Sequence, residues 1–353
     1  MKRRILSLLL SVAVMFTFVG CGKGEVADSS SDASSTVSEA EKVETNINPL
    51  TGLSMNKSAS GKRPVAVMIN NISVAQSIQA GLSEADIVYE LYAEGGITRF
   101  LAIFKDAENM PRIGSIRSAR YSHIDLALAH DAIYVHAGKN ETQAAPHLKA
   151  LGVDNFDLNS GSTSKYGYRV QNGKASEHTL YTDGKKLSQG FSDLNWRTDL
   201  NTAETPWQSF VKEGSEITPN GGACSSLSVK MSGSYISNFK YDTESKKYVR
   251  SNGNTQQKDY NTGKSVSFKN VLVLKTTVTP FANDSTGVVK THLDGGEGYY
   301  VTNGGYVPIK WKKGDAKNPL TITNEDGSTV DYNPGNTFVC LVDKNNSVTI
   351  SAE

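Results

Sequence analysis

Strand-like segments separated by short turns fill the chain from about residue 224 to its end. In these segments apolar and polar residues alternate or apolar residues run together, and Asp-Gly or Gly-Gly pairs interrupt them at short intervals. This pattern is typical of antiparallel sheets, because strands joined by tight turns pair with their neighbours. We therefore predict a mostly antiparallel β unit over residues 224–353. The strand-like segments are 224–231, 235–253, 266–279, 298–313, 320–332 and 337–343.

Residues 47–190 show a different pattern, in which strand and helix signals alternate. Continuous apolar runs predict buried strands, and apolar residues at helical spacing predict amphipathic helices. An α/β unit here and a β unit afterwards make the predicted fold class α+β. The predicted elements are strands at 64–70 and 132–138, a hairpin over 86–104 turning at Glu94-Gly95-Gly96, helices over 118–129 and 140–151, and a long loop over 152–176.

A connector of residues 191–223 joins the two units. Trp196, Trp207 and Phe210 give it more apolar bulk than a free linker needs. We expect it to pack against both units and to limit their relative movement.

The N-terminus has the pattern of a secretory signal, with three basic residues followed by an apolar run from Ile5 to Phe18. The run ends in small residues before Cys21, which resembles the lipobox of bacterial lipoproteins. That resemblance implies a signal peptide over 1–20, diacylation of Cys21 and anchoring on the extracytoplasmic face of the cell membrane. An uncleaved N-terminal anchor is the alternative. Residues 21–46 are rich in serine and acidic residues and predict a disordered tether.

Composition excludes several classes of protein. The formal net charge of the chain is +1, which argues against nucleic acid or an anionic membrane surface as a bulk partner. Cys224 and Cys340 belong to no Cys-x-x-Cys motif, so a redox or zinc site is not expected. They form either a disulfide or two buried thiols. We expect no cofactor.

Several segments together resemble the YerB-like lipoprotein family of Gram-positive bacteria, whose domains are of unknown function. They span residues 48–343 in the order of the family. The resemblance implies a layered architecture of two sheets and a helical layer, in which the two halves are docked, and it implies no reaction. The segments are "NPLTGL", "RPVAVMINN", "YELYAEGGITRFLAIF", "IGSIRSARYSHIDLALAHDAIYVHAG", "EHTLYTD", "FKYDTESKKYVR" and "NPGNTFVCLV".

Ionisable residues are densest between residues 112 and 138. Arg117 and Arg120 are three apart at the start of a predicted helix, beside Ser115 and Ser118. Two guanidinium groups and free helix N–H groups favour a phosphate or carboxylate ligand. Arg99, just after the hairpin turn, joins this candidate ligand-binding set. The alternative is that these arginines form structural ion pairs with Glu90, Glu94 or Asp125.

The histidines do not form a metal motif. His123 and His130 are seven apart, and zinc sites usually need a closer pair and a third ligand. His136, at the end of a predicted strand, and His178, after the long loop, are weak candidates for catalysis. Each is also read as an ordinary structural histidine.

Catalysis by serine, histidine and acid is a second hypothesis. Ser115 or Ser118, His136 or His178, and Asp125, Glu90 or Glu94 would supply the groups, but the sequence has no G-x-S-x-G elbow. We therefore expect a protein that is not an enzyme.

Three functions follow from these observations. The first is a lipid-anchored protein that binds an anionic cell-wall polymer, or another envelope ligand, through Arg117, Arg120 and Arg99. The second is a cell-wall hydrolase that uses His136 or His178 with a neighbouring acid. The third is a scaffold for another envelope protein.

Overall fold

The computed structural model describes residues 45–201, 208–282 and 284–352. The predicted signal peptide, Cys21 and the tether up to residue 44 lie outside these residues, as does Trp207 of the connector. The last two residues of the predicted tether belong to β1 (Thr45–Ile47), which pairs with β2 (Ser54–Asn56).

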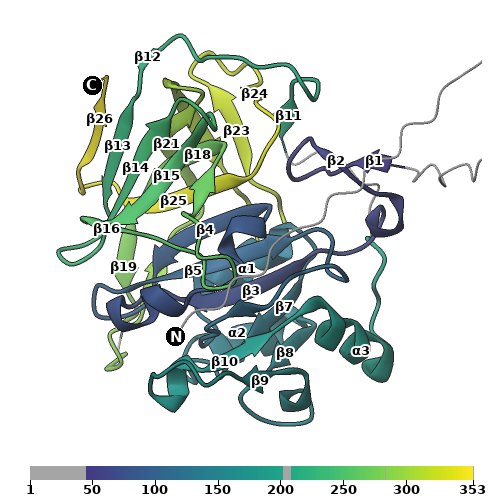
Figure 1. The fold of residues 1–353 in the computed structure, drawn as a ribbon. Helices are drawn as coiled ribbons and strands as arrows, with labels where there is room; N and C mark the ends of the chain where they lie inside the picture. Colours follow the sequence, from purple (N-terminus) through teal and green to yellow (C-terminus); the bar gives the residue numbers. More distant parts are fainter. Residues whose placement is uncertain (1–44, 202–207, 283, 353) are drawn as a thin grey trace, which may run out of the picture. The chain divides into compact units, whose positions relative to one another are not determined.

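A central sheet contains strands from both halves of the chain (Figure 1). β25 (Thr337–Asp343) lies in its middle and pairs in parallel with β4 (Ile87–Tyr92) on one side and with β18 (Asn270–Thr276) on the other. The halves are therefore joined by backbone hydrogen bonds. The sheet order is β12 (Gly222–Ala223), β22 (Gly305–Lys312), β21 (Gly295–Thr302), β18, β25, β4, β5 (Thr98–Phe104), β3 (Val65–Asn70), β7 (Ile133–His136) and β8 (Asn155–Asp157), with β23 (Thr321–Asn324) beside β22.

A second sheet, formed mostly by the C-terminal half, packs on one face of the central sheet. Its strands alternate buried and more exposed residues, as the sequence pattern predicts for a sheet with one face in the core. The α+β fold class with a β-rich C-terminal unit is confirmed. The order is β16 (Thr255–Gln256), β15 (Lys247–Asn252), β14 (Ile236–Asp242), β13 (Ser226–Lys230) and β26 (Val348–Ser351), with β17 (Ser267–Phe268) beside β15.

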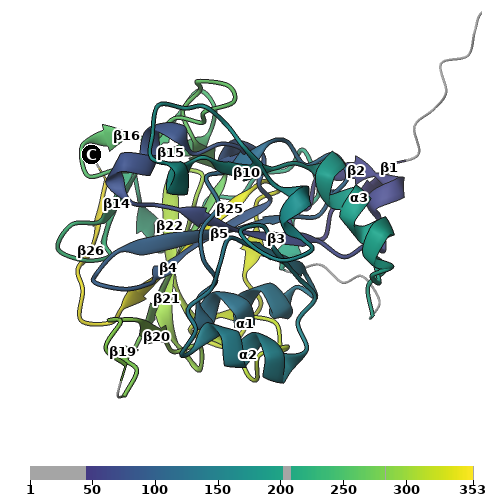
Figure 2. The same ribbon diagram turned by 90° about the horizontal axis from the view of Figure 1, so that it is seen from below.

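Helices α1 (Tyr121–Ala129) and α2 (Ala144–Leu151) lie on one face of the central sheet, and α3 (Gly184–Leu194) lies on the other (Figure 2). Val67 of β3 belongs to one core, with Phe239 of the second sheet and Leu187 of α3. Met68, the next residue, belongs to the other core, with Ile124 of α1. This alternation is the two-residue period of a strand. α2 lies beside α1 on the same face.

Both predicted helices begin later than the sequence pattern suggests. α2 begins at Ala144 rather than Asn140, which places Pro146 in the first turn, where its missing N–H costs no hydrogen bond. α1 begins at Tyr121 rather than Ser118, because the backbone before it bonds to strand ends. The predicted loop 152–176 also contains β8 and β9 (Tyr168–Arg169).

Short strand pairs complete the fold. β9 pairs with β10 (Leu180–Thr182), which also pairs with β6 (Ile113–Gly114). β11 (Ser209–Phe210) pairs with β24 (Asp331–Tyr332), and β19 (Val278–Pro280) pairs with β20 (Val289–Thr291).

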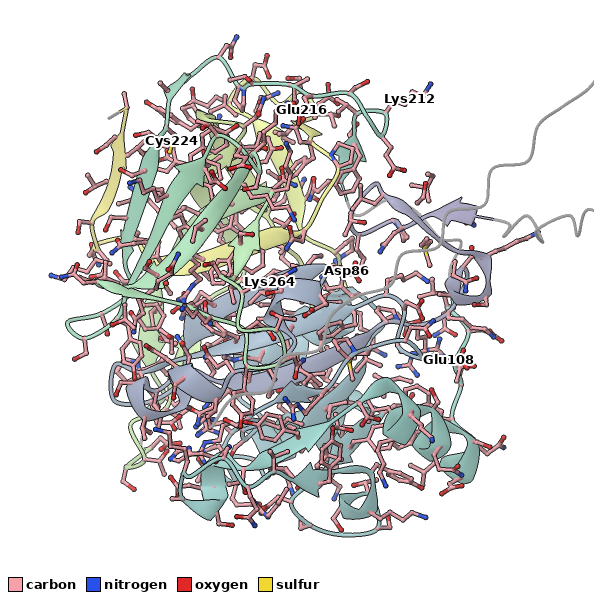
Figure 3. The ribbon with its side chains drawn as sticks, viewed as in Figure 1. Asp86, Glu108, Lys212, Glu216, Cys224 and Lys264 are labelled. Atoms are coloured by element: carbon pink, nitrogen blue, oxygen red, sulfur yellow. The ribbon has the colours of Figure 1, made fainter. Side chains whose placement is uncertain are left out.

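The connector contacts both halves. The side chain of Arg197 pairs with Asp131 at 2.6 Å. Glu216, labelled in Figure 3, pairs with Lys246 at 2.6 Å and with Lys269 at 2.9 Å.

The two described cysteines are free, buried thiols. Cys224 lies among the C-terminal strands (Figure 3). Burial raises the pKa of the Cys224 thiol to about 11. Of the two alternatives from the sequence, the structure therefore contains the buried thiols. No helix in the described part of the chain combines the length and apolar character needed to cross a membrane.

Candidate functional site

Residues 115–119 run across the carboxyl ends of β3 and β7. The N–H of Asn70 donates to the carbonyl of Ser115 at 2.9 Å, and the N–H of Arg117 donates to the carbonyl of Met68 at 3.0 Å. The N–H of Ala119 donates to Gly138 at 3.0 Å. These bonds use backbone groups that a helix would need, so Arg117 precedes α1. The prediction that both arginines lie at the start of one helix is therefore wrong for Arg117.

Arg120 is the extended N-cap residue of α1, with φ −134° and ψ 150°. Its side chain lies beside that of Arg99, which stands at the start of β5. The edge of the sheet where parallel strands end is also where α/β folds commonly bind ligands.

One carboxylate joins Arg99 and Arg120. Arg99 Nη2 donates to Glu94 Oε1 at 2.7 Å, and Arg120 Nε donates to Glu94 Oε2 at 2.6 Å. Both arginines are buried, with exposed fractions of 5% and 8%. Burial raises the pKa of Glu94, but the hydrogen bond from Arg120 and the charge of Arg99 outweigh it and hold the pKa below its usual value.

Arg117 adds a third positive charge to this group. Its Nη2 lies 3.4 Å from Oε1 of Glu177, and its Nη1 donates to the Glu177 carbonyl at 3.1 Å. The Glu177 side chain is 58% exposed, so this pair is mostly solvated. The charge of Arg117 is close enough to act on both Glu94 and Arg99.

Positive charge therefore exceeds negative charge around Glu94. Burial, and after it repulsion from Arg120, lowers the pKa of Arg99 to about 9, and attraction to Glu94 offsets only part of this shift. The guanidinium remains charged at neutral pH. Arg99 Nη1 donates to the Ser118 carbonyl at 2.8 Å, whereas its buried Nε has no hydrogen-bond partner. Buried charged groups usually satisfy their donors, so this side chain has spare capacity.

The two serines of the predicted site differ in their contacts with the arginines. Ser115 is fully buried, and its hydroxyl has no hydrogen-bond partner. Ser118 contributes its carbonyl to Arg99. The structure therefore brings Arg99, Arg117, Arg120 and Ser118 together.

The candidate catalytic histidines have other partners. His136 is fully buried, with Nδ1 2.8 Å from the Gly138 carbonyl and Nε2 2.9 Å from Asn155 Oδ1. Burial lowers its pKa. His178 accepts from Asn70 Nδ2 at 3.0 Å and lies 3.3 Å from Glu177 Oε1. Burial and then Arg117 lower the pKa of His178.

The candidate acids Asp125 and Glu90 contact other residues than the candidate catalytic histidines. Asp125 lies 2.6 Å from Nε2 of His147, a contact that the sequence did not indicate. Glu90 pairs with Arg250 in the interior, at 3.1 Å. Neither acid joins His136 or His178, and the hydrolase hypothesis stays a prediction. Within the described ranges, no group of three His, Cys, Asp or Glu residues has the arrangement of a metal site.

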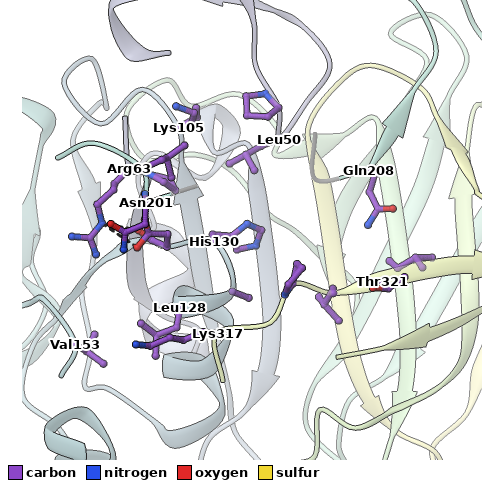
Figure 4. Close-up of a pocket in the computed structure, with 18 of the residues that line it drawn as sticks. Leu50, Arg63, Lys105, Leu128, His130, Val153, Asn201, Gln208, Lys317 and Thr321 are labelled. Atoms are coloured by element: carbon purple, nitrogen blue, oxygen red, sulfur yellow. Dashed lines mark hydrogen bonds and ion pairs between the residues drawn. The ribbon is translucent and has the colours of Figure 1, made fainter. Parts of the chain in front are cut away.

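A pocket of about 910 Å³ lies near the amino end of β3 (Figure 4). Its walls include Leu50, Leu128 and His130, which are labelled in Figure 4. Its buried cation Arg63 pairs with Asp154 at 2.6 Å, and Arg197 pairs with Asp131. The lining holds two acids, Asp131 and Asp154, which pair with these two arginines, and two further cationic residues, Lys105 and Lys317. No motif in the sequence indicated this pocket, because its lining comes from many separate segments.

Comparisons with known proteins identify the relatives of the chain. Residues 50–197 match the family model described as the N-terminal domain of a protein of unknown function (DUF3048), and residues 227–339 match the C-terminal domain of the same description. The Bacillus subtilis (strain 168) protein named "Putative lipoprotein YerB" is 30% identical over 318 residues, which cover 86% of this chain and 88% of that protein. A crystal structure of YerB from Bacillus subtilis is similar with a TM-score of 0.72 and 27% identity, over 86% of this chain and 99% of that one.

Proposed function

This chain belongs to the family of Bacillus subtilis YerB, whose two domains are of unknown function, and on that premise we propose that it is a lipid-anchored envelope protein that binds an anionic group through Arg99, Arg117 and Arg120. The resemblance to this family that the sequence indicated is confirmed. The ligand is a phosphate or carboxylate group of a cell-wall polymer or of another envelope molecule.

The excess of guanidinium groups over carboxylates around Glu94 carries this proposal. Two buried arginines share the carboxylate of Glu94, and the nearby Arg117 pairs with the exposed acid Glu177. Taking a cation out of water costs free energy that a paired anion must offset. An additional oxyanion would therefore be stabilised here, and the planar fork of arginine suits carboxylate and phosphate oxygens.

Anchoring rests on the N-terminal sequence and on the relative. The basic residues, the short apolar run and Cys21 form the pattern of a lipoprotein signal, and the name of the Bacillus subtilis relative describes a lipoprotein. Residues 21–44, fully extended at about 3.3 Å each, would reach roughly 80 Å. The arginines would then work within the envelope, close to the membrane.

The test measures binding of the full-length chain, in detergent, to poly(glycerol phosphate), with dextran as the uncharged comparison. Arg117→Ala removes the most accessible of the three guanidinium groups, and we expect it to weaken binding at least about tenfold, because a charge-assisted hydrogen bond contributes about 1.5–3 kcal/mol. Arg117→Ala/Arg120→Ala should abolish binding.

Arg197→Ala is the matched control. It also removes a partly exposed guanidinium paired with a carboxylate, but at the pocket near the amino end of β3. Its affinity should equal that of the wild type. Unchanged binding by folded Arg117→Ala and by the folded double variant would refute the proposal.

A further inference from the structure

The carboxylate of Glu94 is held in the way that a ligand oxyanion would be held. Its two oxygens each accept from a different guanidinium group, Oε1 from Arg99 and Oε2 from Arg120. Paired arginines bind the two oxygens of external carboxylates and phosphates with this same geometry. The site that we propose for the ligand is thus already occupied by a side chain of the chain itself.

Glu94 stands on a turn between two strands, and its side chain is partly exposed. It begins the turn Glu94-Gly95-Gly96 between β4 and β5, closed by a 2.9 Å bond from the Ile97 N–H to the Glu94 carbonyl. Gly95 and Gly96 have φ values of 56° and 78°, and a Cβ at Gly95 would meet no atom within 4 Å. One quarter of the Glu94 side chain is exposed. A rotation about its side-chain bonds would bring the carboxylate into water while the turn stays closed.

Arg99 and Arg120 are fixed more firmly than Glu94. Arg99 Nη1 donates to the Ser118 carbonyl and Arg120 Nη1 donates to the Ala119 carbonyl, both at 2.8 Å. These carbonyls belong to the segment that is bonded across the strand ends. The two cations therefore stay in position when the carboxylate leaves.

We infer that Glu94 is an internal competitor, and that the ligand of the proposed site is an oxyanion with two free oxygens that replaces the Glu94 carboxylate between Arg99 and Arg120. This inference rests on the proposed function. Arg117 lies beside this position and is the most exposed of the three arginines, with 23% of its side chain exposed, so it meets the incoming anion first. The ligand binds only to molecules in which Glu94 has left the two arginines. The apparent affinity of the wild type is therefore the intrinsic affinity multiplied by the fraction of such molecules.

Removing the charge of Glu94 should therefore strengthen binding. Glu94→Gln keeps the size of the side chain, and we expect its affinity for inorganic phosphate to rise about tenfold or more over the wild type. Glu177→Gln is the matched control, since it removes an equally charged group that contacts Arg117 and leaves the position between Arg99 and Arg120 unchanged. Glu177→Gln should raise the affinity for phosphate no more than about threefold, because it removes only a screened, long-range repulsion of the anion. Calorimetry on the full-length chain in detergent gives both values, and acetate in place of phosphate shows which oxyanion the site prefers.

The outcomes separate the inference from the proposed function. If neither the wild type nor folded Glu94→Gln binds phosphate or acetate, the proposed function fails. If both bind with equal affinity, or Glu94→Gln binds more weakly, the function stands and Glu94 is a support for the arginines, which overturns the inference. Equal gains in Glu94→Gln and Glu177→Gln would also overturn it.

A second measurement applies if Glu94→Gln does not fold. In NMR spectra of the wild-type chain, the amide resonances of Gly95 and Gly96 should shift during a phosphate titration. The midpoint of this shift should equal the midpoint of phosphate binding. Binding without any change in these resonances would overturn the inference.

Discussion

A buried ion pair between the two sheets offers the sharpest test of how the layers are held together. Glu90 on β4 is fully buried, and its Oε2 accepts from Nη2 of Arg250, on β15 of the second sheet, at 3.1 Å. Ser237 donates to the same oxygen, while Thr98 and Asn71 donate to Oε1 at 2.7 and 3.2 Å.

Arg250 is as completely enclosed as its partner. Its side chain is 1% exposed, and its Nη1 donates to Gln257 Oε1 at 2.8 Å. The guanidinium carbon lies 4.8 Å from the ring centre of Phe100 and 5.1 Å from that of Phe338. Its Nη2 also donates to the Ser237 hydroxyl at 2.7 Å, so the arginine has a carboxylate, an amide, a hydroxyl and two aromatic rings as partners.

The two single substitutions should differ in cost. Arg250→Met leaves the Glu90 carboxylate buried with three neutral donors, and removing one partner of a buried pair costs about 3–5 kcal/mol of the free energy of unfolding. Glu90→Gln leaves Arg250 with Gln257, Ser237 and the two rings, and cation–π attraction of up to about 2 kcal/mol offsets part of the loss. We expect about 4 kcal/mol for the first and about 2–3 kcal/mol for the second.

The pair Glu90→Gln/Arg250→Met completes a double-mutant cycle. Because the second substitution removes the charge that the first left unpaired, the double variant should lose less stability than the sum of the two singles, by about 2 kcal/mol or more. Urea unfolding followed by circular dichroism and by tryptophan fluorescence gives these values, with coincident curves as the check on two-state behaviour.

Arg197→Met is the control for the loss of an arginine. Its pair with Asp131 is partly exposed, so it should cost no more than about 1 kcal/mol. An Arg250→Met cost as small as this, or strictly additive costs in the cycle, would refute the view that the two charges depend on each other.

Two further predictions concern acid and the membrane. Burial lowers the pKa of His130 to about 4 and that of His123 to about 3, so below pH 6.5 the unfolded chain binds protons that the folded chain does not, and stability falls as pH decreases from about 6.5 to 4. Burial raises the pKa of Asp86 to about 6. As pH decreases, the folded chain therefore binds a proton at Asp86 before the unfolded chain does, which opposes the loss of stability caused by the histidines. Urea midpoints measured from pH 7 to 4 should thus fall more steeply in Asp86→Asn than in the wild type. An identical pH profile in the two proteins would contradict this assignment. Cys21→Ser should abolish incorporation of radioactive palmitate in cells, and full labelling of that variant would show that Cys21 is not the lipidated residue.

The sequence predicts elements well where their pattern is local. The apolar run at 64–70 became β3, and the run at 86–104 became β4 and β5, with the turn at the predicted glycines. Buried strands between turns need no distant information, because continuous apolar residues suffice to mark them. The β-rich second half was predicted for the same reason.

Distant backbone contacts explain where the sequence prediction was wrong. The start of α1 moved to Tyr121 because Arg117 and Ala119 bond to strand ends, and nothing in their own side chains shows this. β8 was missed within the predicted loop since it has only three residues, two of them partly exposed, at the edge of the sheet. Short edge strands have little apolar pattern to detect.

The arginine cluster combines both kinds of information. Glu94 and Arg99 are five residues apart across a hairpin, so their contact follows from the predicted turn. The contact of Arg120 with Glu94 depends on the segment crossing the strand ends, which only the fold supplies. Even the complete set of contacts fits both an ion-pair scaffold and a ligand site, because a carboxylate held by two arginines is stable in either. The two differ in the free energy needed to exchange Glu94 for an external oxyanion. Comparing Glu94→Gln with Glu177→Gln measures that difference directly, since both lose one charge and only Glu94→Gln loses it between the two arginines.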